Sequence, residues 1–124
     1  MAYSKGTLAG DFIDGVLSEL SGAIAVGVVE IIDELSMDTF SVRDGFDPDV
    51  ACAHMLEVVK AQQQTIKALR LNESIKDMCI TMDTQVHLLT LSKSGKALFY
   101  VAAESAGANV SIMRSVIRKY AKGI

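Results

Sequence analysis

Residues 86–103 read VHLLTLSKSGKALFYVAA, two apolar runs separated by the polar turn SKSGK at residues 92–96. Both faces of the first run are mostly apolar, which predicts a central strand. Because the turn is short, the two strands are expected to pair antiparallel. The segment ESAGAN follows at residues 104–109, and then a helical pattern at residues 110–120 that Asn109 is expected to cap. The stretch predicts a β-hairpin that leads directly into a closing helix.

Five further elements precede this hairpin. Apolar spacing predicts a helix over residues 7–20, a buried strand over 23–32, a second strand over 36–42, a long helix over 47–71 and a third strand over 75–82. The chain of 124 residues is expected to form one domain. The order is therefore helix, strand, strand, helix, strand, strand, strand, helix. It predicts an α+β fold with a five-stranded antiparallel sheet, the long helix on one face and the terminal helices opposite or beside it.

The long helix is the element most suited to binding another molecule. Asp47 and Pro48 form a strong start signal, and about 24 residues at 1.5 Å each give roughly 36 Å, more than a small sheet covers. Its main apolar stripe is predicted to contain Ala51, Met55, Val58, Val59, Gln62, Ile66 and Leu69. Leu56 lies off this stripe and needs another explanation. We therefore expect a homodimer whose interface lies on the exposed side of this helix, with candidate residues His54, Leu56, Val58, Lys60 and Gln63.

The composition supports association rather than membrane insertion. Hydrophobic residues make up 50% of the chain, a surplus that suggests coverage by a partner. No apolar run approaches the roughly 18–20 residues of a membrane span. The N-terminal residues lack the pattern of a signal peptide. These features predict a cytoplasmic protein.

Charge is unevenly distributed along the sequence. The net charge is −3, but residues 1–50 carry ten acidic and two basic residues while the remainder carries five acidic and ten basic ones. This asymmetry favours either association with a charged partner or second copy, or internal pairing within one fold. Arg114, Arg118 and Lys122 recur every four residues on the last helix. We interpret them as a solvated face suited to the helix C-terminus, with a basic partner stripe as the alternative. Nucleic acid is not an expected partner.

No residue pattern predicts catalysis, a cofactor or a metal site. Cys52 and Cys79 are expected to be buried free thiols. The two histidines, His54 and His87, accompany no nucleophile motif. The loop at residues 44–49 lacks the ligand spacing of a calcium loop, and no glycine-rich segment has phosphate-binding spacing. The sequence therefore predicts a binding protein rather than an enzyme.

The element order, and the strand ALFYVAA at residues 97–103 followed by ANVSIMR at residues 108–114, resemble the roadblock/dynein light chain family, a relative of profilin-like and longin folds. The first strand, beginning GAIAV at residues 22–26, is similar to the family's opening. One departure is the first hairpin, where Asp33-Glu34 stands in place of the usual aspartate-glycine turn. The resemblance implies a non-enzymatic homodimer in which long central helices and adjoining strand edges pair across a two-fold axis. The joined helices then form a platform for small Ras-like GTPases or motor-complex components.

Two other function classes remain open from the sequence. A profilin-like sensory domain would hold a small molecule between sheet and helix, and a scaffold subunit would belong to a larger complex. An apolar pocket larger than a side chain would favour the sensor, and a fully packed core would favour the dimeric adaptor.

Overall fold

The computed structural model describes residues 3–4 and 6–121, and the predicted order of elements is confirmed. The elements are α1 (Leu8–Glu19), β1 (Ala23–Glu30), β2 (Leu35–Ser41), α2 (Pro48–Ala68), β3 (Asp77–Thr81), β4 (Gln85–Leu91), β5 (Ala97–Glu104), a 3₁₀ turn η1 (Ser105–Gly107) and α3 (Val110–Tyr120). The predicted strand over 23–32 ends earlier, at Glu30, and the long helix ends at Ala68 rather than near residue 71. The third strand, predicted over 75–82, is shorter, from Asp77 to Thr81, and the second, predicted over 36–42, begins and ends one residue earlier.

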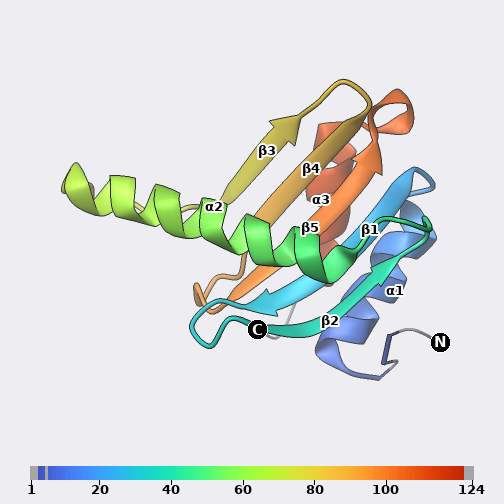
Figure 1. Ribbon diagram of the computed structural model, residues 1–124, viewed down its shortest axis with the longest axis horizontal. Coiled ribbons are helices and arrows are strands. Elements are labelled where there is room, and N and C mark those ends of the chain that lie inside the picture. Colours follow the sequence, from blue (N-terminus) through green and yellow to red (C-terminus); the bar gives the residue numbers. More distant parts are fainter. Residues whose placement is uncertain (1–2, 5, 122–124) are drawn as a thin grey trace.

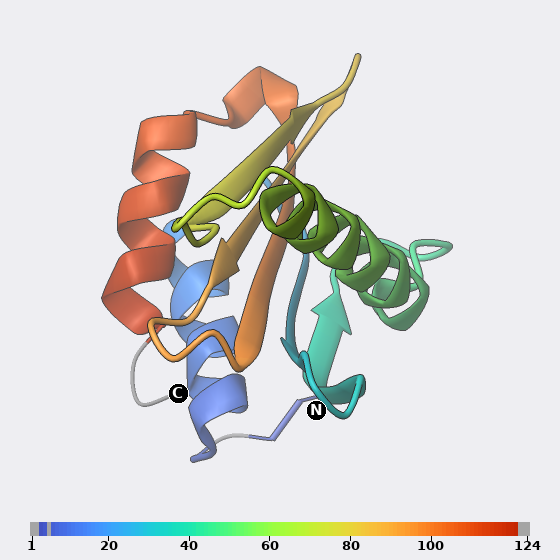
Figure 2. The same ribbon diagram turned by 90° about the vertical axis from the view of Figure 1, so that its left-hand side faces the viewer.

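The five strands form one antiparallel sheet in the order β2-β1-β5-β4-β3 (Figure 1). Helix α2 lies on one face, and α1 and α3 lie on the other, so the molecule has three layers (Figure 2). The central strands β1 and β5 are covered on both faces and are buried almost throughout. Strands β2 and β3 form the two edges of the sheet.

Each face of the sheet has its own apolar core. The core under α1 and α3 contains Phe12, Ile13, Val26, Leu88, Phe99, Met113 and Ile117, among others. The core under α2 contains Ile24, Val29, Leu56, Val59, Leu89, Leu98 and Tyr100, among others. No side-chain nitrogen or oxygen among the described residues is buried without a hydrogen-bond partner. Apolar side chains from helix and sheet therefore meet directly in both cores.

The helix start signals act as the sequence predicts. The Thr7 hydroxyl accepts a hydrogen bond from the Gly10 N–H at 3.0 Å, and the Asn109 side chain accepts one from the Ile112 N–H at 3.1 Å. Side-chain oxygens satisfy the orphan donors of a first helical turn in this way. Gly15 in α1 is required by close packing, because a Cβ there would lie 2.3 Å from the Tyr120 ring of α3.

The first hairpin departs from the common aspartate-glycine turn. Residues 31–34 form the turn, and Glu34 adopts the left-handed conformation at φ 56°, which usually favours glycine. The pairing of β1 with β2 shifts between Val28 and Val29, whose partners are Asp38 and Ser36. Met37 is thus the extra residue of a β-bulge on an edge strand.

Candidate protein-interaction surface

Helix α2 is fixed at its start by the signals that the sequence contains. The Asp47 carboxylate accepts hydrogen bonds from the N–H groups of Asp49 at 2.9 Å and Val50 at 3.3 Å, with Pro48 in the first turn. Gly27 in β1 lets the helix approach the sheet, because a Cβ there would lie 2.6 Å from the Cys52 sulfur. Burial of the Cys52 side chain raises the pKa of its thiol to about 12. This cysteine is therefore a packing residue and not a nucleophile.

The buried face of α2 differs from the predicted stripe by about a quarter turn. Its buried residues are Cys52, Leu56 and Val59. At 3.6 residues per turn, Ala51, Met55, Val58, Gln62 and Leu69 lie on the adjacent flank, which is only partly covered; Leu69 is 63% exposed. We call this flank the α2 flank. The stripe predicted from the sequence therefore combined residues of two rows, namely Val59, which faces the core, and the residues of the α2 flank.

The five predicted interface residues do not share one face of the helix. Leu56 is 3% exposed and packs in the core under α2, so its prediction as an exposed residue was wrong. Lys60 forms an ion pair with Glu34 of the first hairpin at 3.0 Å. Gln63 borders a hollow beside residues 91–95. Val58 lies on the α2 flank, and His54 is exposed on the outward face.

The α2 flank borders the open part of the sheet. Gln62 and Ile66 line a shallow surface hollow of about 670 Å³ together with Met78 of β3. In Figure 1 the C-terminal half of α2 extends past β3, and the upper parts of β3 and β4 are not covered by the helix. Ile80 and His87, which are paired neighbours on β3 and β4, are only partly buried there. The flank and this part of the sheet form two sides of one corner, where the apolar side chains of Met55, Met78 and Ile80 are partly buried. The hollow at the start of β3 also has charged lining, including Lys76, Asp77, Arg114 and Arg118.

The outer edge of β3 is open along its length. Leu91 N–H donates to Lys76 C=O at 3.1 Å and Met82 N–H donates to Gln85 C=O at 2.8 Å. Since backbone groups alternate in direction along an antiparallel strand, the N–H and C=O groups of Asp77, Cys79 and Thr81 point away from β4. Within residues 3–4 and 6–121, no other strand pairs with this edge.

The outer edge of β2 is blocked instead. Val42 N–H donates to Ile24 C=O at 2.8 Å, so the alternation directs the groups of Thr39 outward. The Thr39 N–H donates to the Asp38 carboxylate at 3.1 Å, and the other oxygen of that carboxylate accepts from the Ser4 N–H at 2.7 Å. The Met37 bulge interrupts the same edge. A charged side chain and a bulge are recognised protections of an edge strand.

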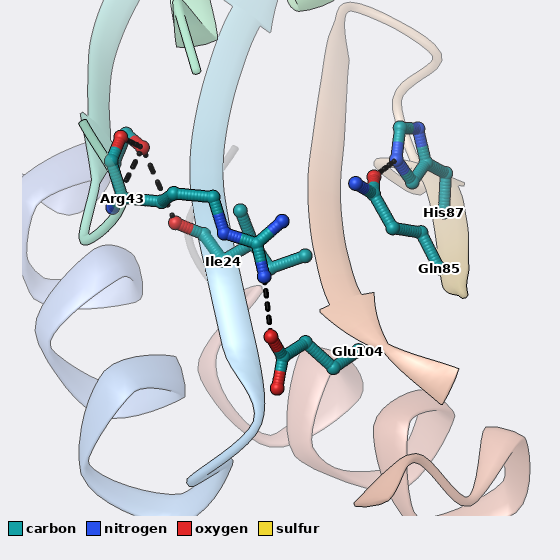
Figure 3. Close-up of polar contacts among 6 residues, drawn as sticks. Ile24, Arg43, Gln85, His87 and Glu104 are labelled. Atoms are coloured by element: carbon teal, nitrogen blue, oxygen red, sulfur yellow. Dashed lines mark hydrogen bonds and ion pairs between the residues drawn. The ribbon is translucent and has the colours of Figure 1, made fainter. Parts of the chain in front are cut away.

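His87 forms a structural network and not a catalytic one. The Tyr100 hydroxyl lies 3.1 Å from His87 Nδ1, and the Gln85 amide oxygen lies 2.8 Å from His87 Nε2 (Figure 3 shows the Gln85 contact). Tyr100 is fully buried, so its O–H is satisfied when the neutral imidazole accepts at Nδ1 and donates from Nε2 to Gln85. Burial lowers the pKa of His87, which favours this neutral form. The sequence showed no partner for this histidine because Tyr100 lies on the neighbouring strand.

Two residues of the predicted basic stripe lie close to an acidic residue of the same chain. Arg114 Nε and Nη2 each donate to one oxygen of Asp77 at 3.1 Å, and Arg118 lies 3.9 Å from the same carboxylate. This pairing links α3 to β3, and the stripe also remains accessible to solvent, with 38% of the Arg114 side chain and 67% of the Arg118 side chain exposed. Lys122 lies outside the described residues.

Internal ion pairs also explain part of the charge asymmetry. Lys119 pairs with Glu19 at 2.8 Å, and Lys60 pairs with Glu34, each joining the acidic first part of the chain to the basic second part. Arg43 and Glu104 form a further pair (Figure 3). Other charged residues of both parts remain exposed.

Two further predictions concern reactive groups. Cys52 is buried as expected. Cys79 is exposed, so its prediction as a buried thiol was wrong; it lies in the middle of β3, an edge strand of the sheet. Among residues 3–4 and 6–121, no group of three histidine, cysteine or carboxylate residues is arranged to hold a metal ion. Every helix in that part of the chain is too short or too polar to traverse a bilayer.

Several solved structures have an architecture similar to that of this chain. MglB of Myxococcus xanthus superposes with a TM-score of 0.76 at 13% identity, covering 95% of this chain and 92% of that one. A roadblock/LC7 domain of Streptomyces avermitilis gives 0.66 at 15% identity over 90% and 89%. The gliding protein MglB of Thermus thermophilus gives 0.72 at 10% identity over 96% and 89%. No profile of a known protein family matches the sequence, and no curated protein is detectably similar to it. The chain has the roadblock/LC7 fold, which confirms the resemblance seen in the sequence.

Proposed function

We propose that two copies of this chain pair through the outer edge of β3 and the α2 flank, and that the joined α2 helices bind a small Ras-like GTPase. The observation that carries the proposal is the contrast between the two sheet edges. The β2 edge is blocked by Asp38 and the Met37 bulge, whereas the β3 edge is open and adjoins an uncovered apolar corner. An open apolar edge is a site for pairing with another chain.

A two-fold axis through the β3 edge satisfies both features together. Antiparallel pairing of two β3 strands extends the sheet from five strands to ten and satisfies the free groups of Asp77, Cys79 and Thr81. The overhanging half of each α2 then lies above the uncovered part of the other sheet. Met55 and Val58 on the α2 flank, and Met78 and Ile80 on β3, are thereby removed from water. Such isologous pairing is the commonest arrangement of soluble oligomers.

The outward face of α2 supplies the proposed platform. This face carries His54, Glu57, Ala61, Gln64 and Ala68, all exposed. Two such helices side by side offer a broad and shallow surface, which suits a folded protein better than a small ligand. The class of partner, a Ras-like GTPase, comes from the roadblock resemblance. The packed core between α2 and the sheet supports this adaptor role over a sensor with an internal small molecule.

Oxidative cross-linking of the natural cysteine tests the dimer. When the axis passes through Cys79, the two Cys79 residues form a hydrogen-bonded pair with about 5.5 Å between Cα atoms, within the range for a disulfide. We expect mild oxidant to produce a covalent dimer, and Cys79→Ser to abolish it although Cys52 remains. Met78→Cys in a Cys79→Ser chain reports the neighbouring register. If neither cysteine cross-links and the mass stays at 13.3 kDa at micromolar concentration, the β3 pairing is wrong.

Capture from native cytosol tests the platform. The tagged chain is incubated with cytosol in the presence of GTP or GDP analogues, and Ala61→Asp serves as a matched variant on the outward face. We expect recovery of a GTPase that depends on the nucleotide and is lost with Ala61→Asp, while the dimer remains. Recovery of no GTPase under either condition, together with a thermal shift by a metabolite, would redirect the function to the sensor class.

A further inference from the structure

An exposed apolar knob lies at the tip of the β1–β2 hairpin. Ile32 is 74% exposed and Leu35 is 60% exposed, and neither belongs to a core of the described residues. The hairpin contacts α2 at two points, because Glu34 pairs with Lys60 at 3.0 Å and the Thr39 hydroxyl donates to Asp49 of α2 at 2.8 Å. Surface apolar residues gathered on a fixed element mark a contact site more often than scattered ones.

Carboxylates surround this knob. Glu30, Asp33 and Glu34 lie in or beside the turn. Glu30 and Asp33 are close enough that the hydrogen bond and charge of Asp33 raise the pKa of Glu30. A neighbouring positive charge from another molecule would favour the ionised form of Glu30.

A hollow of complementary character lies at the same end of the sheet. It has a volume of about 520 Å³ and is formed where β3, β4 and α3 meet. Ile75, Leu91 and Ala121 supply apolar surface, and the exposed side chains of Lys76, Lys93 and Arg118 supply positive charge. Asp77, whose carboxylate lies 3.9 Å from Arg118, also lines the hollow, so three basic side chains face one acidic one there. The volume readily admits two aliphatic side chains.

The knob and the hollow belong to adjacent turns. Ile31 N–H donates to Lys96 C=O at 2.8 Å, which joins the β1–β2 turn to the β4–β5 turn. Figure 1 shows both turns at the end of the sheet that lies away from η1. A surface that carries a projection and a complementary cavity side by side can pair with its own copy about a two-fold axis.

We propose that this end of the molecule binds the same end of a second copy, with the Ile32–Leu35 knob of each chain in the Lys76–Lys93–Arg118 hollow of the other. The contact uses side chains rather than strand addition, because the β2 edge is blocked. It is distinct from the β3 pairing, and it joins dimers into larger assemblies. The apolar area is small, so the association is weak and depends on concentration.

Sedimentation velocity across concentrations up to about 1 mM, the range of weak association, tests this contact. At low salt we expect species heavier than the dimer, which high salt reduces because opposite exposed charges are screened. Ile32→Ser with Leu35→Ser should weaken the heavier assembly at least tenfold and leave the lighter species unchanged. Ile112→Ser is a matched control, since Ile112 is 54% exposed on α3 away from both turns.

Charge reversal identifies the two surfaces. Asp33→Lys and Lys93→Glu should each reduce the heavier assembly, and the two together should restore it. Mixing the serine knob variant with the Lys93→Glu variant should restore part of the association, because one knob and one hollow stay intact. A constant mass up to 1 mM, or an assembly that ignores the serine substitutions, would overturn the proposal. Loss of the heavier assembly with Lys93→Glu, but not with Asp33→Lys or the serine substitutions, would also overturn it, because the hollow would then bind a different segment of the second copy.

Discussion

Two neighbouring residues on α2 separate folding from assembly. Leu56 and Val58 are both aliphatic, but Leu56 is 3% exposed in the core whereas Val58 is only partly buried on the α2 flank. Replacing each with aspartate therefore tests whether the helix lies on the sheet as described. We expect Leu56→Asp to prevent folding and Val58→Asp to leave a folded monomer.

The expected magnitude for Leu56→Asp follows from its burial. Loss of a buried leucine side chain costs about 2–5 kcal/mol, and a carboxylate without a partner in an apolar core adds several kcal/mol more. The total is comparable to the whole stability of a domain, roughly 5–15 kcal/mol. The far-ultraviolet circular dichroism of this variant should therefore lack the native helical signal, and its urea transition should be lost or displaced to far lower urea.

Val58→Asp acts through the dimer. Its side chain is partly exposed in one chain, so the fold should lose about 1 kcal/mol or less, as for ordinary surface substitutions. A symmetric interface contains the residue twice, and the lost burial together with two apposed carboxylates should cost at least about 3 kcal/mol. That corresponds to roughly a hundredfold increase in the Kd of the dimer.

Sedimentation equilibrium and circular dichroism distinguish the outcomes. Ala61→Asp on the outward face is the control and should retain both helicity and dimer mass. A Val58→Asp protein that stays dimeric at the same concentrations would show that the α2 flank is not the interface. A folded Leu56→Asp protein would refute the packing of α2 on the sheet itself.

Three further outcomes follow from the contacts. Gly27→Ala places a Cβ 2.6 Å from the Cys52 sulfur and should destabilise the folded protein by about 1–3 kcal/mol. Cys52→Ala in the same chain should recover part of that loss. If urea unfolding shows that the effects of the two substitutions on stability simply add, the close approach of these two residues is contradicted. Asp77→Asn removes the carboxylate that pairs with Arg114, so amide hydrogen exchange should become faster in β3 and at the α3 C-terminus, and unchanged protection would show that the pair does not hold them together. Because burial in the folded protein lowers the pKa of His87, this histidine binds more protons in the unfolded chain below about pH 6.5. The free energy of unfolding should therefore fall as the pH drops through that region. If a His87→Gln variant shows the same dependence of unfolding free energy on pH, the dependence belongs to other groups.

Much of the fold follows from local patterns that are visible in the sequence. The hairpin of β4 and β5, the capping residues Asp47 and Asn109, and the buried strand β1 depend on side chains close together in the chain. These signals act within one turn of helix or one strand. They therefore do not depend on how distant parts of the chain pack, which is why the predicted order of elements is confirmed.

The interaction surface depended on information that is not local. The helical pattern of α2 contains two neighbouring apolar rows, and only Gly27 and the Cys52 contact show which of them meets the sheet. Likewise the partners of Arg114 and His87, Asp77 and Tyr100, come from other elements. The exposure of Cys79 also depends on sheet order, because the short sequence of β3, DMCIT, did not show that this strand lies at an edge.

The two sheet edges show why pairing must be read from backbone direction as well as from composition. Strands β2 and β3 each contain a methionine next to an aspartate, and each also contains a threonine, so their sequences do not indicate which edge is free. In β2 the Asp38 carboxylate turns back onto the outward N–H of Thr39, whereas in β3 the Asp77 carboxylate turns toward Arg114 and leaves the backbone edge unoccupied. The alternation of the backbone explains the difference, because the residue after Asp38 directs its N–H outward whereas the residue after Asp77 directs its N–H toward β4. An aspartate therefore blocks an edge only where the next residue faces outward, and the β3 edge lacks such an arrangement, which is why we propose it as the edge that a second copy pairs with.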